Sequence, residues 1–235
     1  DLTVTVPDAV ARTQLAEHVA RIVRRRIFDG TYATGEYVRL DQLAAELGVS
    51  VTPVREALFE LKAEGLLAQQ PHRGFVVLPL TGRDLADVSN VQAYIGGELA
   101  ARAAANITDE QLTGLRRIQS DLEAAYAAGD DERAVRLNHE FHRAINVAAD
   151  SPKLAQLMSQ ITRYAPETVF PRIAGWPQKS NRHHRRLISA LAKRDPELAR
   201  AAMSEHLAAG AKPLIEHLIA LGVISSPDGE PASGH

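Results

Sequence analysis

Apolar residues follow helical spacing along most of the chain, with one short interval of strand-like runs before residue 80. Residues 12–29 carry apolar side chains every three to four positions and end at Gly30, which predicts a first helix. The run "LDQLAAELG" predicts a short second helix ending at Gly48, and "SVTPVREALFELKAEG" predicts a third ending at Gly65. "LLAQ" and "GFVVLPL", on either side of "QPHRG", predict a β-hairpin.

From residue 81 onward the pattern is helical, and capping residues mark where helices begin. The start signals are Thr81 with Asp84, Thr108 with Gln111, Asp130, Ser151-Pro152, Ser180 and Asp195-Pro196. Proline and glycine in "VFPRIAGWPQ" (169–178) predict a long loop. The predicted fold is therefore mainly α: a helical domain with a β-hairpin over 1–80, an all-helical antiparallel bundle over 81–222, and a disordered tail over 223–235.

Composition narrows the classes of protein to consider. Apolar residues make up 45% and charged residues 24%, as in ordinary globular domains, and the absence of cysteine excludes disulfides and thiolate chemistry. No apolar run is long enough to span a membrane, so we expect a cytoplasmic protein. The net charge is −2, and neither residues 1–80 nor residues 81–235 carry an excess of Lys and Arg over Asp and Glu. Any contact with nucleic acid must therefore come from local clusters, such as Arg24, Arg25 and Arg26.

The N-terminal helices have the arrangement of a winged helix-turn-helix. Two helices meet at the tight turn Gly48-Val49-Ser50, with a third helix before them and a hairpin after them. The second helix of such a unit enters the major groove, so Thr52 and Arg55 are the expected base-reading residues, with Arg55 suited to guanine. The hairpin tip, His72-Arg73-Gly74, is expected to reach an adjacent groove or the backbone. Spacing alone fits a purely structural helical hairpin equally well.

A second group of candidate residues lies in the helical part. In "NHEFHRAI", Asn138 and His142 lie one helical turn apart on the same face. His184 is eleven residues before Asp195 and His206 eleven after it, and equal offsets from a turn bring residues of antiparallel helices to the same height. Together they are a candidate metal site, although a histidine on a helix is more often a surface or hydrogen-bonded core residue. The remaining histidines of this part are expected to be solvated or to neighbour the site: His139, His183 and His217.

Three imidazole nitrogens suit Zn²⁺ better than Mg²⁺ or Ca²⁺, with Ni²⁺ or Mn²⁺ as alternatives. Zinc with an open position activates water, so a three-histidine hydrolase or lyase is an alternative function. The chain offers no clear general base for it, since Glu140 is two residues from His142 and should face elsewhere on a helix. There is also no nucleophile elbow or phosphate loop. We therefore do not expect an enzyme.

The segment "LAAELGVSVTPVREALFELKAEGLL", followed by "RGFVV", resembles the DNA-binding domain of the GntR family of bacterial transcription regulators over roughly residues 14–78. "VSVTPVREAL" carries most of the resemblance. Many members have arginine after the serine, where this chain has Val51, so Arg55 is the main reader that the resemblance carries over. Symmetric regulators of this kind are expected to bind a palindromic operator as homodimers.

Residues 81–222 resemble the FCD ligand-binding domain of the FadR-type branch of this family. A metal-binding subset has Asp-x-x-x-His and then one histidine on each of two later helices, which falls here on Asn138, His142, His184 and His206. Asparagine has no charge where aspartate is usual, so the resemblance implies that the metal binds more weakly. The metal then also keeps more positive charge with which to attract an anionic ligand.

The resemblance also implies a small carboxylate effector held beside the metal. Where many relatives place an arginine for that carboxylate, this chain has "NVQAYIGG", so Gln92, Tyr94 and Arg163 are the candidates to contact it. The implied function is a ligand-responsive regulator, most often a repressor in this family. A regulator with a metal-free effector pocket is the other alternative.

Overall fold

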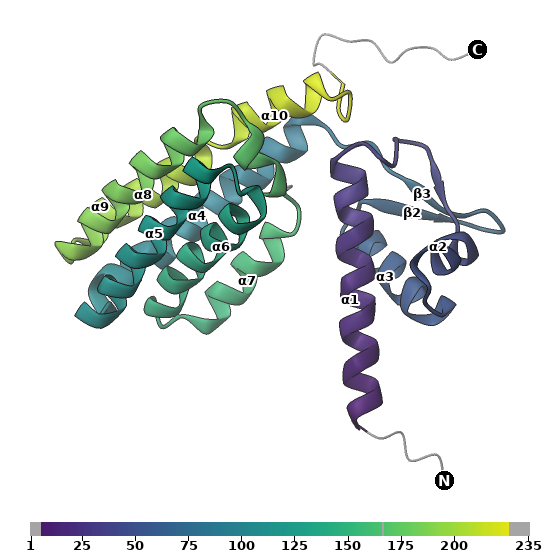
Figure 1. The fold of residues 1–235 in the computed structure, drawn as a ribbon, viewed down its shortest axis with the longest axis horizontal. Coiled ribbons are helices and arrows are strands. Elements are labelled where there is room, and N and C mark those ends of the chain that lie inside the picture. Colours follow the sequence, from purple (N-terminus) through teal and green to yellow (C-terminus); the bar gives the residue numbers. More distant parts are fainter. Residues whose placement is uncertain (1–5, 166, 226–235) are drawn as a thin grey trace. The chain divides into compact units, whose positions relative to one another are not determined.

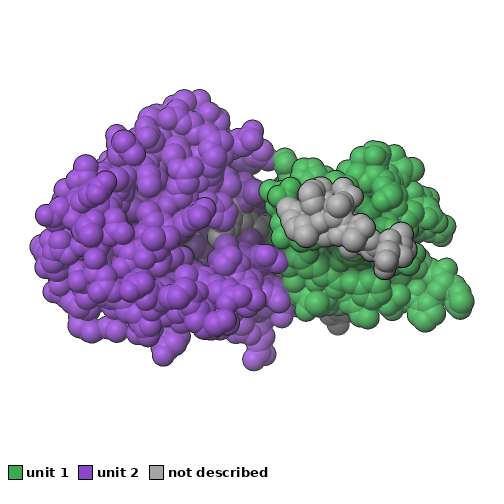
Figure 2. All heavy atoms as spheres, turned by 90° about the horizontal axis from the view of Figure 1, so that it is seen from below, with its two compact units in different colours: residues 1–82, 218–235 green, residues 83–217 purple. Residues whose placement is uncertain are grey.

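The chain folds into two compact units, coloured separately in Figure 2. In a computed structural model that describes residues 6–165 and 167–225, the first unit holds the residues up to Gly82 and those from Leu218 onward. The second unit is Arg83–His217. No helix in the described part of the chain is long and apolar enough to cross a bilayer.

The first unit combines helices with a three-stranded antiparallel sheet of order β1-β3-β2, of which Figure 1 labels β2 and β3. Its elements are α1 (Val6–Phe28), β1 (Tyr37–Val38), α2 (Leu40–Leu47), α3 (Val51–Ala63), β2 (Leu67–Gln70) and β3 (Gly74–Val77). Helix α1 begins before the predicted residue 12 and packs along α3. The core of the unit includes Val19, Val23 and Ile27 from α1, Val54, Leu58 and Leu61 from α3, and Phe75 and Val77 from β3.

The turn between α2 and α3 follows from its glycine. Gly48 adopts φ 66°, a left-handed conformation that ends α2 and directs its N–H to the carbonyls of Ala44 and Ala45. Helix α3 then begins at Val51, after Ser50 as its N-cap residue. Pro53 is therefore the third helical residue, within the first turn, where no backbone N–H is needed.

The predicted hairpin is present as β2 and β3, which pair with Gln70 opposite Gly74. Strand β1 was not predicted, because two residues are too short to show an alternating pattern. It pairs with β3 through Val38 opposite Phe75 and completes the sheet of the winged helix-turn-helix.

The second unit is built from helices, and all strands in the described residues precede Leu78. Its elements are α4 (Gly82–Asn106), α5 (Asp109–Ala128), α6 (Asp131–Ala148), α7 (Pro152–Thr162), the short 3₁₀ helix η1 (Glu167–Arg172), α8 (Trp176–Ala192), α9 (Pro196–Ala208) and α10 (Ala211–Ala220). Helices α5 and α6 pack together, as do α8 and α9. Buried residues of α4, including Leu99, Ala100 and Ala103, contribute to the common core.

Most of the predicted capping residues begin a helix. Thr108 and Gln111 form a complete capping box at α5, and the side chains of Asp130 and Asp195 accept hydrogen bonds from the first turns of α6 and α9. Ser151 precedes α7 without capping it, and its hydroxyl accepts a hydrogen bond from Arg102.

The predicted long loop at 169–178 is wrong, as is the predicted helix start at Ser180. The segment contains most of η1, and α8 begins four residues earlier, at Trp176 after Gly175. Pro177 lies in the first turn of α8, where proline is tolerated, so it marks a helix start rather than a loop. Ser180 is buried inside the helix.

The C-terminal end differs from a tail beginning at residue 223. Ile224 is buried, and Val223 Cγ2 would lie 3.3 Å from a Cβ added to Gly30 in the first unit. The rest of the predicted tail, 226–235, lies outside the described residues.

Candidate metal centre and nucleic-acid interface

The start of α3 presents the predicted base-reading residues to solvent. Pro53, Val54 and Leu58 turn into the core, which leaves Thr52 and Arg55 exposed on the opposite side of the helix. The arrangement is that of a recognition helix, whose N-terminal side chains are free to meet base edges.

The tip of the β2–β3 hairpin places His72 and Arg73 in solvent. His72 has φ 62° and Gly74 has φ 97°, so the turn depends on left-handed conformations. A Cβ at Gly74 would lie 2.9 Å from the Val38 carbonyl oxygen, so only glycine allows this close approach of β3 to β1. The wing is thereby held to the sheet.

Two of the three arginines in the predicted basic cluster are occupied inside the unit. Arg24 forms two hydrogen bonds with Glu64, at 3.0 and 2.7 Å, and Arg26 pairs with Glu46. Of the cluster, Arg25 is the exposed member. The partners lie 40 and 20 residues away in the chain, so the sequence did not reveal that Arg24 and Arg26 are paired.

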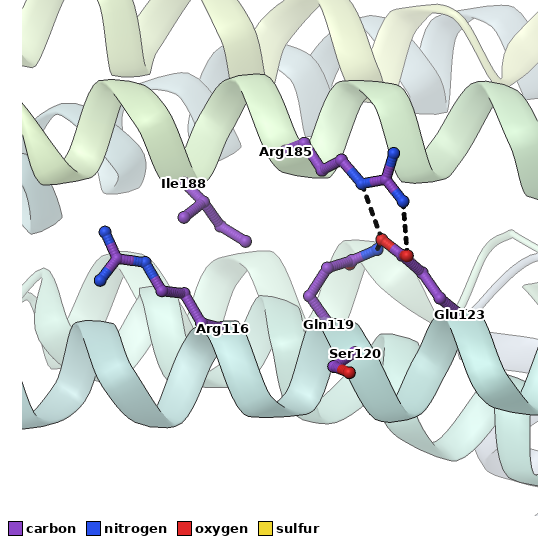
Figure 3. A pocket seen from close by; sticks show the side chains of 6 residues that line it. All are labelled: Arg116, Gln119, Ser120, Glu123, Arg185 and Ile188. Carbon is purple, nitrogen blue, oxygen red and sulfur yellow. Dashed lines mark hydrogen bonds and ion pairs between the residues drawn. The ribbon is translucent and has the colours of Figure 1, made fainter.

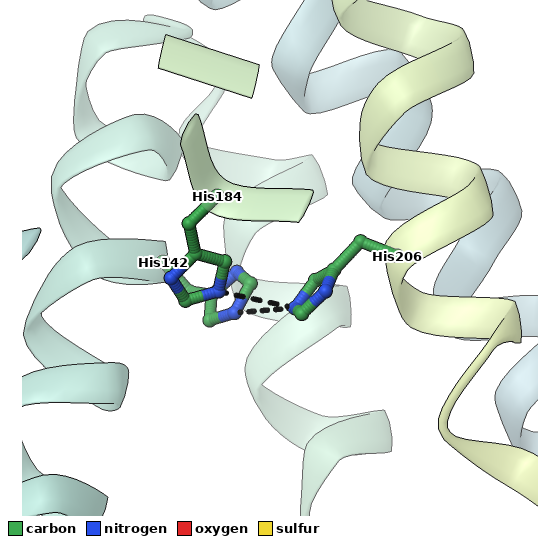
Figure 4. Close-up of side chains that lie close together, drawn as sticks. All are labelled: His142, His184 and His206. Atoms are coloured by element: carbon green, nitrogen blue, oxygen red, sulfur yellow. Dashed lines mark hydrogen bonds between the residues drawn. The ribbon is translucent and has the colours of Figure 1, made fainter. Parts of the chain in front are cut away.

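In the second unit, the structure brings together three of the four predicted metal-ligating residues. Figure 4 shows the imidazoles of His142, His184 and His206, from α6, α8 and α9, pointing toward one another. His206 Nε2 lies 3.2 Å from His184 Nε2 and 3.3 Å from His142 Nε2. The meeting of His184 and His206 predicted from their offsets is confirmed.

The imidazoles suit a transition-metal ion in charge and spacing. Burial, and then the neighbouring imidazoles, hold the pKa of His184 and His206 well below the usual 6.5, so both rings are neutral at pH 7. Tetrahedral zinc with bonds of about 2.0–2.1 Å separates its nitrogens by about 3.3 Å, close to the two measured distances. His206 Nδ1 is buried without a hydrogen-bond partner, so the polar contacts of this ring are those of its Nε2 with His184 and His142.

Aromatic rings pack around the histidine cluster. The Phe141 ring stacks on His184 with centroids 4.0 Å apart, and Trp176 lies 6.0 Å from the His206 ring. His183 is also close, at 5.6 Å from His206, so it neighbours the site, whereas His139 is exposed. This dry surrounding favours neutral imidazoles.

Gln119 of α5 contacts the cluster and was missed in the sequence. Its Oε1 lies 2.7 Å from His184 Nδ1, and the residue is 3% exposed. The available signal was a polar residue within an apolar stripe, since Leu115 and Leu122 occupy the same buried face of α5.

Asn138, the predicted oxygen ligand, lies half-buried one turn before His142 on the same face of α6. Its role as a ligand remains a prediction.

The three predicted effector contacts differ in their burial. On α4, Gln92 is 7% exposed whereas Tyr94 is 72% exposed, because two residues on a helix face different directions. Arg163 lies in an exposed position at the end of α7. Of the three, Gln92 therefore turns toward the interior of the unit.

Comparison with known proteins gives the same two-part organisation. A family model for bacterial regulatory proteins of the gntR family matches residues 15–77, and an FCD domain model matches residues 87–209. The "probable D-xylose utilization operon transcriptional repressor" of Paenarthrobacter nicotinovorans is 30% identical over 201 residues, which cover 85% of this chain and 88% of that protein.

A second relative supplies both a sequence and a structural match. The HTH-type transcriptional regulator McbR of Escherichia coli strain K12 is 27% identical over 195 residues, covering 81% of this chain and 88% of that protein. The solved structure of E. coli McbR/YncC matches with a TM-score of 0.70 at 26% identity, over 86% of this chain and 98% of that chain. The chain thus belongs to the GntR family of bacterial transcription regulators, with a winged helix-turn-helix and an FCD domain, and is a regulator rather than an enzyme.

Proposed function

We propose that this regulator is a ligand-responsive repressor whose FCD domain binds a divalent metal ion and a small carboxylate effector. Zn²⁺ suits the site best, with Ni²⁺ and Mn²⁺ as alternatives. The observation that carries the proposal is the spacing of 3.2 and 3.3 Å between three imidazole nitrogens of α6, α8 and α9.

The ligand set would consist of His142, His184, His206 and Asn138, all of them uncharged. Among the described residues, no aspartate, glutamate or cysteine joins the three histidines. When bound, the ion supplies a positive centre that attracts a carboxylate oxygen. Because the protein ligands leave this charge uncompensated, metal and carboxylate should each strengthen the binding of the other.

The DNA-binding unit would read its operator through α3. Exposed Thr52 and Arg55 face base edges, and the wing residues His72-Arg73-Gly74 contact the adjacent groove or backbone. We propose that the protein acts in the cytoplasm as a homodimer on a palindromic operator, since two-fold symmetry in the protein matches two half-sites.

Repression follows if the effector prefers the arrangement that does not bind DNA. Its binding then shifts the population away from the operator-bound form. The P. nicotinovorans relative carries the word repressor in its name, which supports this direction of control.

The proposal is tested by measuring operator affinity with and without metal and carboxylate. Binding sites are first selected from randomised DNA duplexes, and affinity is then followed by fluorescence anisotropy with a panel of mono-, di- and tricarboxylates. We expect at least one carboxylate to weaken operator binding of the Zn²⁺-loaded protein by about tenfold or more, within the usual range of coupling between sites.

The matched variants are His184→Ala, which should lose the response, and His139→Ala, which should keep it. An equal response in chelator-treated protein would contradict the role of the metal and support a metal-free effector pocket. If no carboxylate acts on any form of the protein, the proposed effector class is wrong.

A further inference from the structure

Resting on the metal site proposed above, we propose that Gln119 is a positioning residue. It holds His184 in the tautomer that is protonated on Nδ1, so that the unprotonated Nε2 faces the other two histidines. Glu123 and Arg185 fix the orientation of Gln119 in turn.

The first step is the burial of the Gln119 amide. A buried amide is costly unless its polar atoms are paired, and those of Gln119 are. Its Nε2 lies 3.0 Å from Glu123 Oε1 and 3.0 Å from Asn181 Oδ1, while its Oε1 lies 2.7 Å from His184 Nδ1. The side chain therefore joins α5 to the helix that carries His184.

Glu123 determines which end of the amide faces the histidine. Arg185 donates to both oxygens of Glu123, at 2.9 and 2.5 Å, and so holds it as a carboxylate, which can only accept hydrogen bonds (Figure 3). The amide group next to this carboxylate must therefore be the NH₂ donor. Oxygen is left to face His184.

The amide oxygen in turn determines where the proton of His184 lies. Oε1 of Gln119 has no proton to give, so Nδ1 of His184 must donate to it. A neutral imidazole carries one ring proton, which leaves Nε2 bare beside Nε2 of His206 at 3.2 Å. This is the form of histidine that binds a metal ion, and its orientation is set before any ion arrives.

The hydrogen bonds that lead from His184 through Gln119 and Glu123 end at Arg185 on the protein surface. Arg116, Gln119, Ser120, Glu123, Arg185 and Ile188 line a groove of about 260 Å³ between α5 and α8, seen in Figure 3. Gln119 contacts both this groove and the buried His184, so it connects the surface pair Arg185–Glu123 to the histidine cluster. Because Arg185 follows His184 directly on α8, the same helix supplies the ligand and the residue that fixes its support.

A merely structural glutamine would give a different result from a positioning one. Replacing it would then lower stability without changing where the proton of His184 lies. The test must therefore read the tautomer itself, which ¹⁵N–¹H correlation NMR of the histidine rings does in the metal-free protein.

The experiment compares wild type with Gln119→Leu, Glu123→Gln and the control Gln160→Leu, an equivalent change at an exposed position of α7. We expect wild-type His184 to carry its proton on Nδ1 and Gln119→Leu to show a mixture. Affinity for Zn²⁺, measured by competition with a chelator, should fall about 10- to 100-fold in Gln119→Leu and less in Glu123→Gln, where the amide is free to turn. The control should match wild type.

The results separate this inference from the proposed metal site. A wild-type His184 protonated on Nε2 overturns the inference, as does a Gln119→Leu variant with unchanged tautomer and unchanged Zn²⁺ affinity. If Gln119→Leu does not fold, Glu123→Gln gives the same two readings. Wild-type protein that holds the Nδ1 proton but binds no Zn²⁺ supports the orienting role of Gln119 and contradicts the metal site.

Discussion

The two units of the molecule differ in the polar side chains that they bury. The DNA-binding unit pairs its charges beside the core, as in Arg24 with Glu64, and leaves Arg55 exposed for a partner. The FCD domain also pairs charges, as in Arg200 with Glu98, and in addition buries uncharged polar groups in its interior, namely His184, His206 and Gln119. Losing a partner should therefore appear as lost stability in the first unit and as lost ligand affinity in the second.

The largest change in stability is expected from Arg24→Ala. This variant leaves the carboxylate of Glu64, whose side chain is 9% exposed, without its main partner. Removing one partner of a buried pair costs about 3 kcal/mol of unfolding free energy, which urea denaturation measures. The exposed neighbour variant Arg25→Ala should stay within about 0.5 kcal/mol of wild type. Equal stability of the two variants would mean that the pair does not support the fold.

Arg55→Ala should have the next largest effect, on operator binding alone. A bidentate contact to a base contributes about 1–3 kcal/mol, so affinity should fall by roughly 10- to 100-fold in fluorescence anisotropy. Stability and Zn²⁺ binding should not change, because Arg55 is exposed on α3. Retained operator affinity would rule out Arg55 as the main reader.

Asn138→Asp adds a negative charge to the FCD domain, at a site whose proposed ligands are all uncharged. If Asn138 is a ligand, Zn²⁺ should bind about tenfold more tightly, or ~1.4 kcal/mol, and the carboxylate effector more weakly. Isothermal titration measures both, and Asn90→Asp, the same change at an exposed position of α4, is the control. An unchanged Zn²⁺ affinity would remove Asn138 from the ligand set.

The smallest effect is expected from pH on the metal-free protein. The pKa of His184 and of His206 is lowered on folding, so below about pH 6.5 the unfolded chain binds protons that the folded chain does not. The free energy of unfolding should therefore fall as the pH drops from about 6.5 toward the folded pKa values. Glu98 and Glu123, whose pKa values are also lowered, act below about 4.5, which leaves a window for the histidines.

Denaturation at several pH values between 5 and 7 measures this effect. The double variant His184→Gln with His206→Gln should show a flatter curve. A wild-type curve that is already flat over this range would mean that the two rings are not held neutral by burial.

Local signals explain why much of the fold was predictable. Gly48 and the capping residues Thr108, Asp130 and Asp195 act within a few residues of their own position, so they can be read directly. The meeting of His184 and His206 was predictable for the same reason, because a single turn separates their helices.

Long-range partners explain what the sequence could not show. Gln119 meets His184 across 65 residues, and Arg24 meets Glu64 across 40. No local pattern reports which helices pack together. The start of α8 at Trp176 was missed because Pro177 has the same appearance in a loop and in the first turn of a helix.

The central claim, that three histidines of the FCD domain form a metal site, is tested most directly by metal content. Elemental mass spectrometry on tag-free protein, after incubation with Zn²⁺ and removal of unbound ion, should find about one equivalent per chain. His184→Ala should hold none, because one ligand of four contributes about 3–4 kcal/mol. No metal in the wild type, or equal metal in both proteins, would contradict the account.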